Sequence, residues 1–443
     1  MAQLLAVSYE GQKVYRFTIS TKEELDALTN LKDHPEFKFD FWSSPKIGNV
    51  DVKLSDSALQ FVSPLVNNYT VLIPDVEKLI QEQAIPYTPP SSKLQTNHST
   101  SDLTIQNPFF YTYQNSSAIF QFMDGLGAKK DFIGYTFKQQ QIFGYYFGTG
   151  NKTAIVQGGL HAREWISPAF VVYLAAFLAG SSQAAKSLLA EYTVLLVPLV
   201  NIDGYDYTRR ADGDRLWRKN MQINNDSTVG IDLNRNYNFK WDTPGGASLD
   251  SMNETYRGPY PNAAPETKAL SEYLAKVQNK VSYIDIHSYG QAFLYPWGYT
   301  CTVSSPDEPD LRSSSFAGAQ AIASLYGTFY TVGSSCSNLY QTSGASDDYA
   351  YGVLGVKYAM TIELRDEGQY GFLLPPEQII PVGTETVAAL LAVWEYISKD
   401  SNLTSKYIPQ TPTSTIPPTH TVTQSSGQPL PVQLFWLLFI FAI

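Results

Sequence analysis

The stretch TAIVQGGLHAREWISPAFVVYLAAFLA, residues 153–179, decides the fold of this chain. It begins with an apolar run at 153–157, which predicts a buried strand, and after two glycines it ends in the helix-length apolar segment 166–179. A buried strand that leads into an apolar helix is typical of a mostly parallel sheet covered by helices. His161 and Glu164 lie between the two segments, just beyond the strand.

The same alternation continues from about residue 107 to 399. It predicts an α/β fold with a mixed, mostly parallel, doubly wound sheet and helices on both faces. In such sheets, ligands bind beyond the carboxyl ends of the strands. The further predicted strands are 193–200, 281–286 and 356–362, and the further predicted helices are 265–277 and 376–397.

A small α+β domain is expected at residues 1–85. Its pattern of apolar and polar residues predicts the order β-α-β-β-α-β, the split βαβ or ferredoxin-like arrangement, which is too widely reused to indicate a function. Residues 86–106 are rich in Pro, Ser, Thr and Asn, with Lys93 as the only basic residue. This composition predicts an exposed linker between the small domain and a large domain at 107–400.

Composition narrows the classes of function. Of the 443 residues, 44% are hydrophobic and 16% are charged, with 30 Tyr and 23 Phe, so a large aromatic core is expected rather than disorder. The net charge of -10 argues against nucleic-acid binding. The two cysteines, Cys301 and Cys336, exclude a Cys-rich zinc module but permit one disulfide.

The C-terminal part resembles a stalk followed by an anchor signal. Residues 401–427 are rich in Ser, Thr and Pro, which predicts an extended glycosylated stalk. The apolar end, 434–443, is shorter than the roughly 20 residues that a spanning helix needs. Small residues at 425–427 precede it, which is the layout of a cleaved GPI signal at 428–443, and the alternative is an inert hydrophobic tail.

The secretory pathway is the expected location. Seven Asn-X-Ser/Thr sequons favour it, and with a GPI anchor the protein would be held at the cell surface. Residues 1–10 contain no signal peptide, and we therefore expect that the N-terminus is incomplete. The sequons are at Asn68, Asn97, Asn115, Asn151, Asn225, Asn253 and Asn402.

Four chemically active residues follow three predicted strands. His161 and Glu164 follow the first, His287 follows the strand at 281–286, and Glu363 follows the strand at 356–362. Two histidines and one carboxylate, with a fourth position open, are typical of a catalytic zinc site. An acidic residue such as Asp232 could accept a hydrogen bond from the other ring nitrogen of a zinc-bound histidine.

At this point the chain resembles a known family, the zinc metallocarboxypeptidases of the pancreatic A/B type, which are made as precursors. The resemblance covers about residues 13–398. It rests on motifs that occur in order: HAREW at 161–165, NIDGY at 201–205, RLWRK at 215–219, DLNRN at 232–236, IHSYGQ at 286–291 and TIELRDEGQYGFLLP at 361–375.

The resemblance implies a role for each matching residue. His161, Glu164 and His287 would hold one zinc ion, and Glu363 would be the general base. Arg218 would stabilise the developing oxyanion. Arg235 would bind the terminal carboxylate through two parallel hydrogen bonds. The remaining substrate-binding residues would be Asn234 beside Arg235, Tyr340 closing over the substrate, and Arg163, Ser288, Tyr289 and Phe372 along the groove.

Asp347 occupies the position that implies substrate preference. A buried carboxylate there would pair with a C-terminal Lys or Arg, and Gly298 would leave room for a long side chain. Val353 and Leu354 add one residue after this loop, so that Asp348 or neither carboxylate could reach the pocket instead. In that case the preference would be hydrophobic or broad.

The resemblance also implies a disulfide and a regulatory domain. Cys301 and Cys336 lie at positions where some relatives have a disulfide, and the alternative is two free buried thiols. The N-terminal domain would inhibit the enzyme until the linker is cut, and the enzyme is expected to be a monomer that acts on peptide or protein C-termini. A catalytically inactive peptide-binding relative is the competing hypothesis, although the ligands and the base are present.

Overall fold

The computed structural model describes residues 7–31, 37, 39–43, 45–88 and 107–407, all within one compact unit that spans residues 1–409. The predicted C-terminal signal, and most of the predicted linker and stalk, lie outside the described residues.

The N-terminal domain has the predicted β-α-β-β-α-β order. Its four-stranded sheet has the order β2-β3-β1-β4 and pairs in an antiparallel manner. Two capped helices follow from Thr21 and Ser55, whose hydroxyls accept hydrogen bonds from the backbone three residues on. The elements are β1 Gln12–Ile19, α1 Lys22–Asn30, β2 Asp40–Phe41, β3 Gly48–Ser55, α2 Asp56–Val62, β4 Tyr69–Ile73 and α3 Val76–Gln83.

The large domain is built on an eight-stranded mixed sheet with the order β11-β10-β12-β9-β7-β8-β6-β5. Its centre, β12-β9-β7-β8, is parallel, in agreement with the predicted mixed, mostly parallel sheet. The antiparallel strands that flank the centre were not among the predicted strands. The strands are β5 Lys129–Tyr135, β6 Gln141–Phe147, β7 Lys152–Gly158, β8 Tyr192–Val197, β9 Lys280–Ser288, β10 Ala292–Tyr295, β11 Thr331–Ser334 and β12 Tyr358–Leu364.

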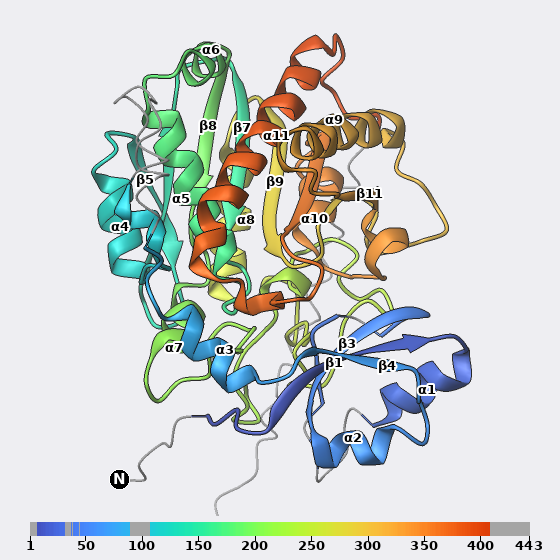
Figure 1. The fold of residues 1–443 in the computed structure, drawn as a ribbon. Helices are drawn as coiled ribbons and strands as arrows, with labels where there is room; N and C mark the ends of the chain where they lie inside the picture. The colour runs from blue at the N-terminus through green and yellow to red at the C-terminus, as the bar shows by residue number, and fades with distance from the viewer. Residues whose placement is uncertain (1–6, 32–36, 38, 44, 89–106, 408–443) are drawn as a thin grey trace, which may run out of the picture. The chain divides into compact units, whose positions relative to one another are not determined.

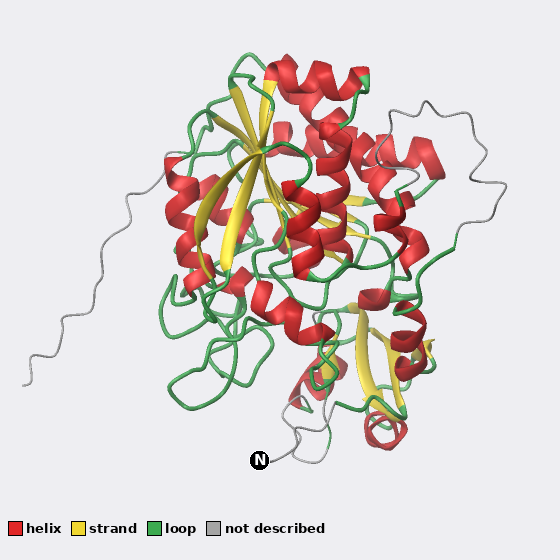
Figure 2. Ribbon diagram, turned by 90° about the vertical axis from the view of Figure 1, so that its left-hand side faces the viewer, coloured by secondary structure: helices red, strands yellow, loops and turns green. Residues whose placement is uncertain are grey.

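Helices cover this sheet on both faces (Figures 1 and 2). The apolar helix α5 is buried along most of its length, because it packs between the sheet and α11. The long helix α11 is apolar enough to span a membrane by length and composition, but it packs on α5 and α9 in the core. The helices are α4 Ser116–Asp124, α5 Ile166–Ala179, α6 Gln183–Glu191, α7 Ile202–Arg209, α8 Pro265–Lys276, α9 Glu308–Tyr326, α10 Ser346–Gly352 and α11 Ile379–Lys399.

The two central strands β9 and β12 extend further than the apolar runs predicted. His287 and Glu363 lie within the last two residues of their strands and pair with each other in the parallel register. Polar residues can continue a strand here because the ladder needs only backbone hydrogen bonds. The prediction that both side chains meet at the carboxyl edge of the sheet is confirmed.

The segment 400–407, which follows α11, is fastened to the large domain. Asp400 accepts hydrogen bonds from Lys357 (2.6 Å) and Tyr358 (2.7 Å). The fully buried Asp307 accepts hydrogen bonds from the Ser405 hydroxyl and the Lys406 backbone, both at 2.9 Å. Residues 401–407, assigned to the stalk by composition, therefore pack on the large domain.

Candidate metal centre and substrate pocket

Three donor groups converge at the carboxyl edge of the sheet. His161 Nδ1 lies 2.8 Å from Glu164 Oε1, His287 Nδ1 lies 3.0 Å from Glu164 Oε2, and the two Nδ1 atoms are 3.1 Å apart. All three side chains are buried, and one ligand atom from each falls within 4.8 Å of the others. Two imidazole nitrogens and a carboxylate oxygen are donors that suit zinc. The His-Glu-His group can therefore hold one metal ion.

The charges of this group depend on its buried surroundings. Burial alone would raise the pKa of Glu164, but the adjacent imidazoles of His161 and His287 outweigh burial and lower it. The carboxylate therefore stays ionised, as a metal ligand must be. On the far side of His161, Nε2 lies 3.1 Å from Asp232 Oδ1, in agreement with the partner that the sequence predicted.

Glu363 lines the same cleft as the three donor residues. Burial raises the pKa of its carboxyl group, and the negative charge of Glu164 adds to the effect. A bound dication would act in the opposite direction, because it stabilises a nearby negative charge. A carboxylate whose proton affinity is raised in this way suits general base chemistry.

Two arginines face the cleft from different segments. Arg218 is held by Asp232, which accepts from its Nη2 at 2.9 Å and its Nε at 3.1 Å, and its Nη1 lies 3.8 Å from Glu164. Arg235 donates to the Asn234 carbonyl (2.7 Å) and to the Tyr340 hydroxyl (2.8 Å). Both guanidinium groups thus line the cleft and are held by hydrogen bonds to their neighbours, which suits binding of a carboxylate or an oxyanion.

The contacts of two adjacent aspartates, Asp347 and Asp348, show which of them faces the cleft. Asp347 lines the cleft and accepts a hydrogen bond from the Ser335 hydroxyl at 2.7 Å. Asp348 instead accepts from the backbone N–H groups of Gly298 and Tyr299, both at 2.9 Å. Burial raises the pKa of Asp347, and no ion pair with this carboxylate occurs among the described residues. The extra residue at 353–354 therefore leaves Asp347 in the pocket.

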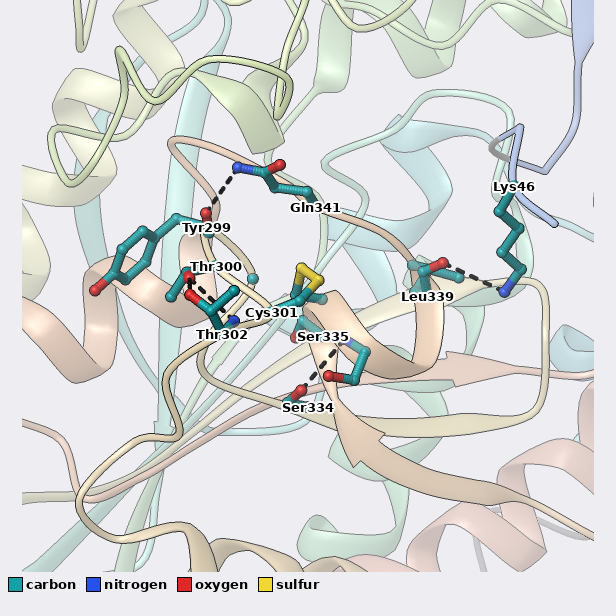
Figure 3. Close-up of a disulfide and its surroundings, with 12 residues drawn as sticks. Lys46, Tyr299, Thr300, Cys301, Thr302, Ser334, Ser335, Leu339 and Gln341 are labelled. Atoms are coloured by element: carbon teal, nitrogen blue, oxygen red, sulfur yellow. Dashed lines mark hydrogen bonds between the residues drawn. A yellow bond between two sulfur atoms is a disulfide. The ribbon is translucent and has the colours of Figure 1, made fainter. Parts of the chain in front are cut away.

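Gly298 packs closely against Thr342, a residue that lines the cleft. A Cβ atom on Gly298 would lie 2.2 Å from Thr342 Oγ1, so a larger residue there would displace the Thr342 side chain. The loop that follows Gly298 is cross-linked to the residues after β11, because Cys301 and Cys336 form the predicted disulfide (Figure 3). The alternative of two free thiols is wrong.

The N-terminal domain contacts three residues that were predicted to line the groove. Asp40 Oδ1 lies 3.1 Å from Arg163 Nη1, and Tyr289 donates to Asp51 at 2.9 Å. The Trp42 ring lies 5.1 Å from the Phe372 ring. Lys46 also donates to the carbonyl oxygens of Asn338 and Leu339, both at 3.3 Å, just before Tyr340 (Figure 3).

Sequence reasoning missed some members of the site. Asp285 lies two residues before His287 on β9 and was read as part of a buried apolar strand, but its carboxylate is 3.0 Å from His287 Nε2. The strand period of two could have found it, because residues i and i+2 point to the same face. The contact of Ser288 is through its backbone, which donates to Glu164 at 3.2 Å. Glu254 also lines the cleft.

We expect zinc to bind stoichiometrically through the His-Glu-His group. Replacing His287 with Ala removes one of three ligands and should reduce zinc from about one ion per chain to a small fraction. Elemental analysis of dialysed protein measures this, with His98→Ala in the predicted linker as the matched control. Full zinc occupancy in the His287 variant would contradict the site.

Comparisons with known proteins agree with the fold and the metal group. The family described as "Zinc carboxypeptidase" matches residues 128–389, and the one described as "Carboxypeptidase activation peptide" matches residues 15–83. The chain is 35% identical to carboxypeptidase A1 of Bos taurus over 88% of its own length and 94% of the relative's. Carboxypeptidase A4 of Mus musculus is also 35% identical, over 87% and 94% of the two lengths.

Solved structures give the same picture. The crystal structure of thrombin activatable fibrinolysis inhibitor superposes with a TM-score of 0.76 at 28% identity, covering 88% of this chain and all of that one. The carboxypeptidase A of Helicoverpa armigera, at 22% identity and a TM-score of 0.74, shares the fold over 88% of this chain and 98% of its own.

Proposed function

This chain belongs to the zinc carboxypeptidase family, and from that premise we propose that it is a secreted precursor whose mature form removes Lys or Arg from peptide C-termini. Membership makes it a metallocarboxypeptidase, a zinc enzyme that hydrolyses the last peptide bond. The observation that carries the Lys or Arg preference is the buried Asp347 carboxylate in the cleft, which has no cationic partner among the described residues.

The electrostatics of the pocket support a basic substrate. Burial raises the pKa of Asp347, because the hydrogen bonds from Ser335 and the Asp348 backbone and the nearby His287 only partly compensate its ionised form. A substrate ammonium or guanidinium group would supply that compensation as a buried ion pair. A substrate carboxylate would meet like charge and be rejected.

The remaining residues divide the work of hydrolysis. Zinc held by His161, Glu164 and His287 supplies Lewis-acid chemistry when bound. Glu363 takes a proton from the attacking water and passes it to the leaving amine. Arg218, oriented by Asp232, stabilises the negative charge that develops on the carbonyl oxygen.

Other residues position the peptide. Arg235 binds its terminal carboxylate in two parallel hydrogen bonds, with Asn234 beside it and Tyr340 covering it. Arg163, Ser288, Tyr289 and Phe372 hold the preceding residues. Glu254 lines the same cleft and stays without an assigned role.

The N-terminal domain acts as the inhibitor in this proposal. It uses Asp40 to pair with Arg163 and Asp51 to bind Tyr289, two groups that the substrate needs. The domain is released when the linker, 86–106, is cut. The large catalytic domain then comprises residues 107–407, because 401–407 pack on it, and the proposed stalk begins after Tyr407.

We expect Asp40→Asn to weaken this inhibition. Removing one partner of a largely buried ion pair costs about 2–5 kcal/mol, so the uncut precursor should hydrolyse peptides measurably faster than the wild-type precursor. The rate before and after linker cleavage measures this. Glu23→Gln, an exposed charge change on the same domain, is the matched control. Equal precursor rates, or no gain on cutting the wild-type linker, would refute the proposal.

Secretion and anchoring complete the proposed function. Exposed sequon asparagines at Asn68, Asn151, Asn225 and Asn402 are accessible to glycosylation, which a mobility shift after deglycosylation would test. A GPI anchor replacing residues 428–443 would be tested by release from membranes with a phosphoinositide-cleaving phospholipase C. Protein that stays membrane-bound after treatment would count against the anchor.

A further inference from the structure

Both histidines of the metal group are backed by a carboxylate, although the sequence indicated only one. His161 has Asp232 behind it, and His287 has Asp285, whose Oδ2 lies 3.0 Å from His287 Nε2. Asp285 and His287 are two residues apart on β9 and so point to the same face of the sheet. Asp285 is fully buried, and its location therefore has to be explained by what it binds.

Binding of a cation at His287 would define which ring nitrogen carries the proton. Its Nδ1 faces the metal group, 3.0 Å from Glu164 Oε2, and must be unprotonated to bind a cation. Its Nε2 must then carry the hydrogen and needs an acceptor. Asn234 Nδ2 lies 3.4 Å from Nε2 but offers only N–H groups, because the other amide atom of Asn234 accepts from the Ser346 backbone.

Asp285 is the carboxylate in position to accept that hydrogen. The hydroxyl of Ser346 donates to the same carboxylate from α10 and fixes its orientation. Asp285 Oδ1 has no hydrogen-bond partner among the described residues, so the group is held in the core by only these two contacts. An incompletely satisfied buried carboxylate is costly without a nearby cation, and a bound dication at His287 would offset that cost.

We propose that Asp285 is a positioning residue for zinc, which fixes the tautomer of His287 and strengthens it as a ligand. Carboxylates in this role change metal affinity by about 10–100-fold. The inference requires His287 to be a ligand, but it is independent of the preference for Lys or Arg.

The test uses the full chain, Asp285→Asn and Ser346→Ala. Competition with a chromogenic chelator should give zinc affinity about 10–100-fold weaker for Asp285→Asn and within about threefold of wild type for Ser346→Ala, which keeps the carboxylate. The absorption spectrum of the cobalt-substituted protein should shift in Asp285→Asn only. The metal-free Asp285→Asn protein should still melt in one cooperative transition, which shows that it folds.

Two results would overturn the inference. The first is zinc affinity in Asp285→Asn within threefold of wild type. The second is weaker affinity together with an unchanged cobalt spectrum and loss of the cooperative melting transition of the metal-free protein, which would mean that Asp285 only supports the fold. Full zinc binding by His287→Ala would instead show that His287 is not a zinc ligand. Failure of the proposed metal site can therefore be distinguished from failure of the role proposed for Asp285.

Discussion

Replacing Glu363 with Gln is expected to lower kcat for peptide hydrolysis by about 10²–10⁴-fold, the range that a positioned general base contributes. Gln has the same shape as Glu but cannot take a proton from the attacking water. Because Glu363 lines the cleft beside the metal group without being one of its three donors, zinc should remain bound. KM should change much less than kcat, since Glu363 acts mainly in the transition state.

The measurement is steady-state kinetics on the linker-cleaved enzyme, with zinc content determined on the same sample. His98→Ala serves as the matched control for handling and cleavage. A variant with full zinc and a kcat within tenfold of wild type would eliminate Glu363 as the base. Loss of zinc in Glu363→Gln would show instead that this residue is a fourth ligand.

Replacing Asp347 with Asn is expected to lower kcat/KM for a peptide ending in Arg by about 10²–10³-fold. Removing one partner from a buried ion pair costs about 3–5 kcal/mol, because the substrate guanidinium is then left in the pocket without a counter-charge. A peptide that ends in Phe makes no such pair, and its kcat/KM should change by less than about threefold. Three peptides that differ only in a terminal Arg, Phe or Glu measure the effect.

Asp348→Asn is the matched variant, one residue along the same helix. Its carboxylate holds the backbone of Gly298 and Tyr299, so the change should cost about 1–3 kcal/mol of stability. The ratio of Arg to Phe turnover should stay closer to wild type than in Asp347→Asn. If Asp348→Asn alone abolished the preference for Arg, Asp348 rather than Asp347 would be the residue that selects the substrate. If the wild-type enzyme preferred Phe, neither carboxylate would select a basic residue.

The sequence was sufficient for the four central strands of the sheet and for the metal group, but it did not predict β5, β6, β10 and β11. Apolar runs of strand length, each followed by His or Glu, identify the carboxyl ends of β7, β9 and β12, and parallel pairing brings those ends together. The prediction of His161, His287 and Glu363 at one edge needed no knowledge of side-chain packing. The roles assigned to them beyond metal binding stay predictions.

Other features could not be read from the sequence, for physical reasons. Asp347 and Asp348 are consecutive in α10, where successive side chains point about 100° apart, so a shift of one residue exchanges their surroundings. The contact between Asp40 and Arg163 joins residues 123 apart in the chain, and no local pattern encodes it. Asp285 is different, because it lies two residues before His287 on β9 and points to the same face, so the strand period could have found it.

The segment 400–407, which packs on the large domain after α11, also has a consequence for protein engineering. Tyr407 packs its ring 5.0 Å from Trp297, the residue that precedes the pocket glycine. A chain shortened at Lys399 would leave the buried Asp307 without the hydrogen bonds of Ser405 and Lys406. Expression fragments, affinity tags and display fusions should therefore place their junction after Tyr407, although the last helix ends eight residues earlier.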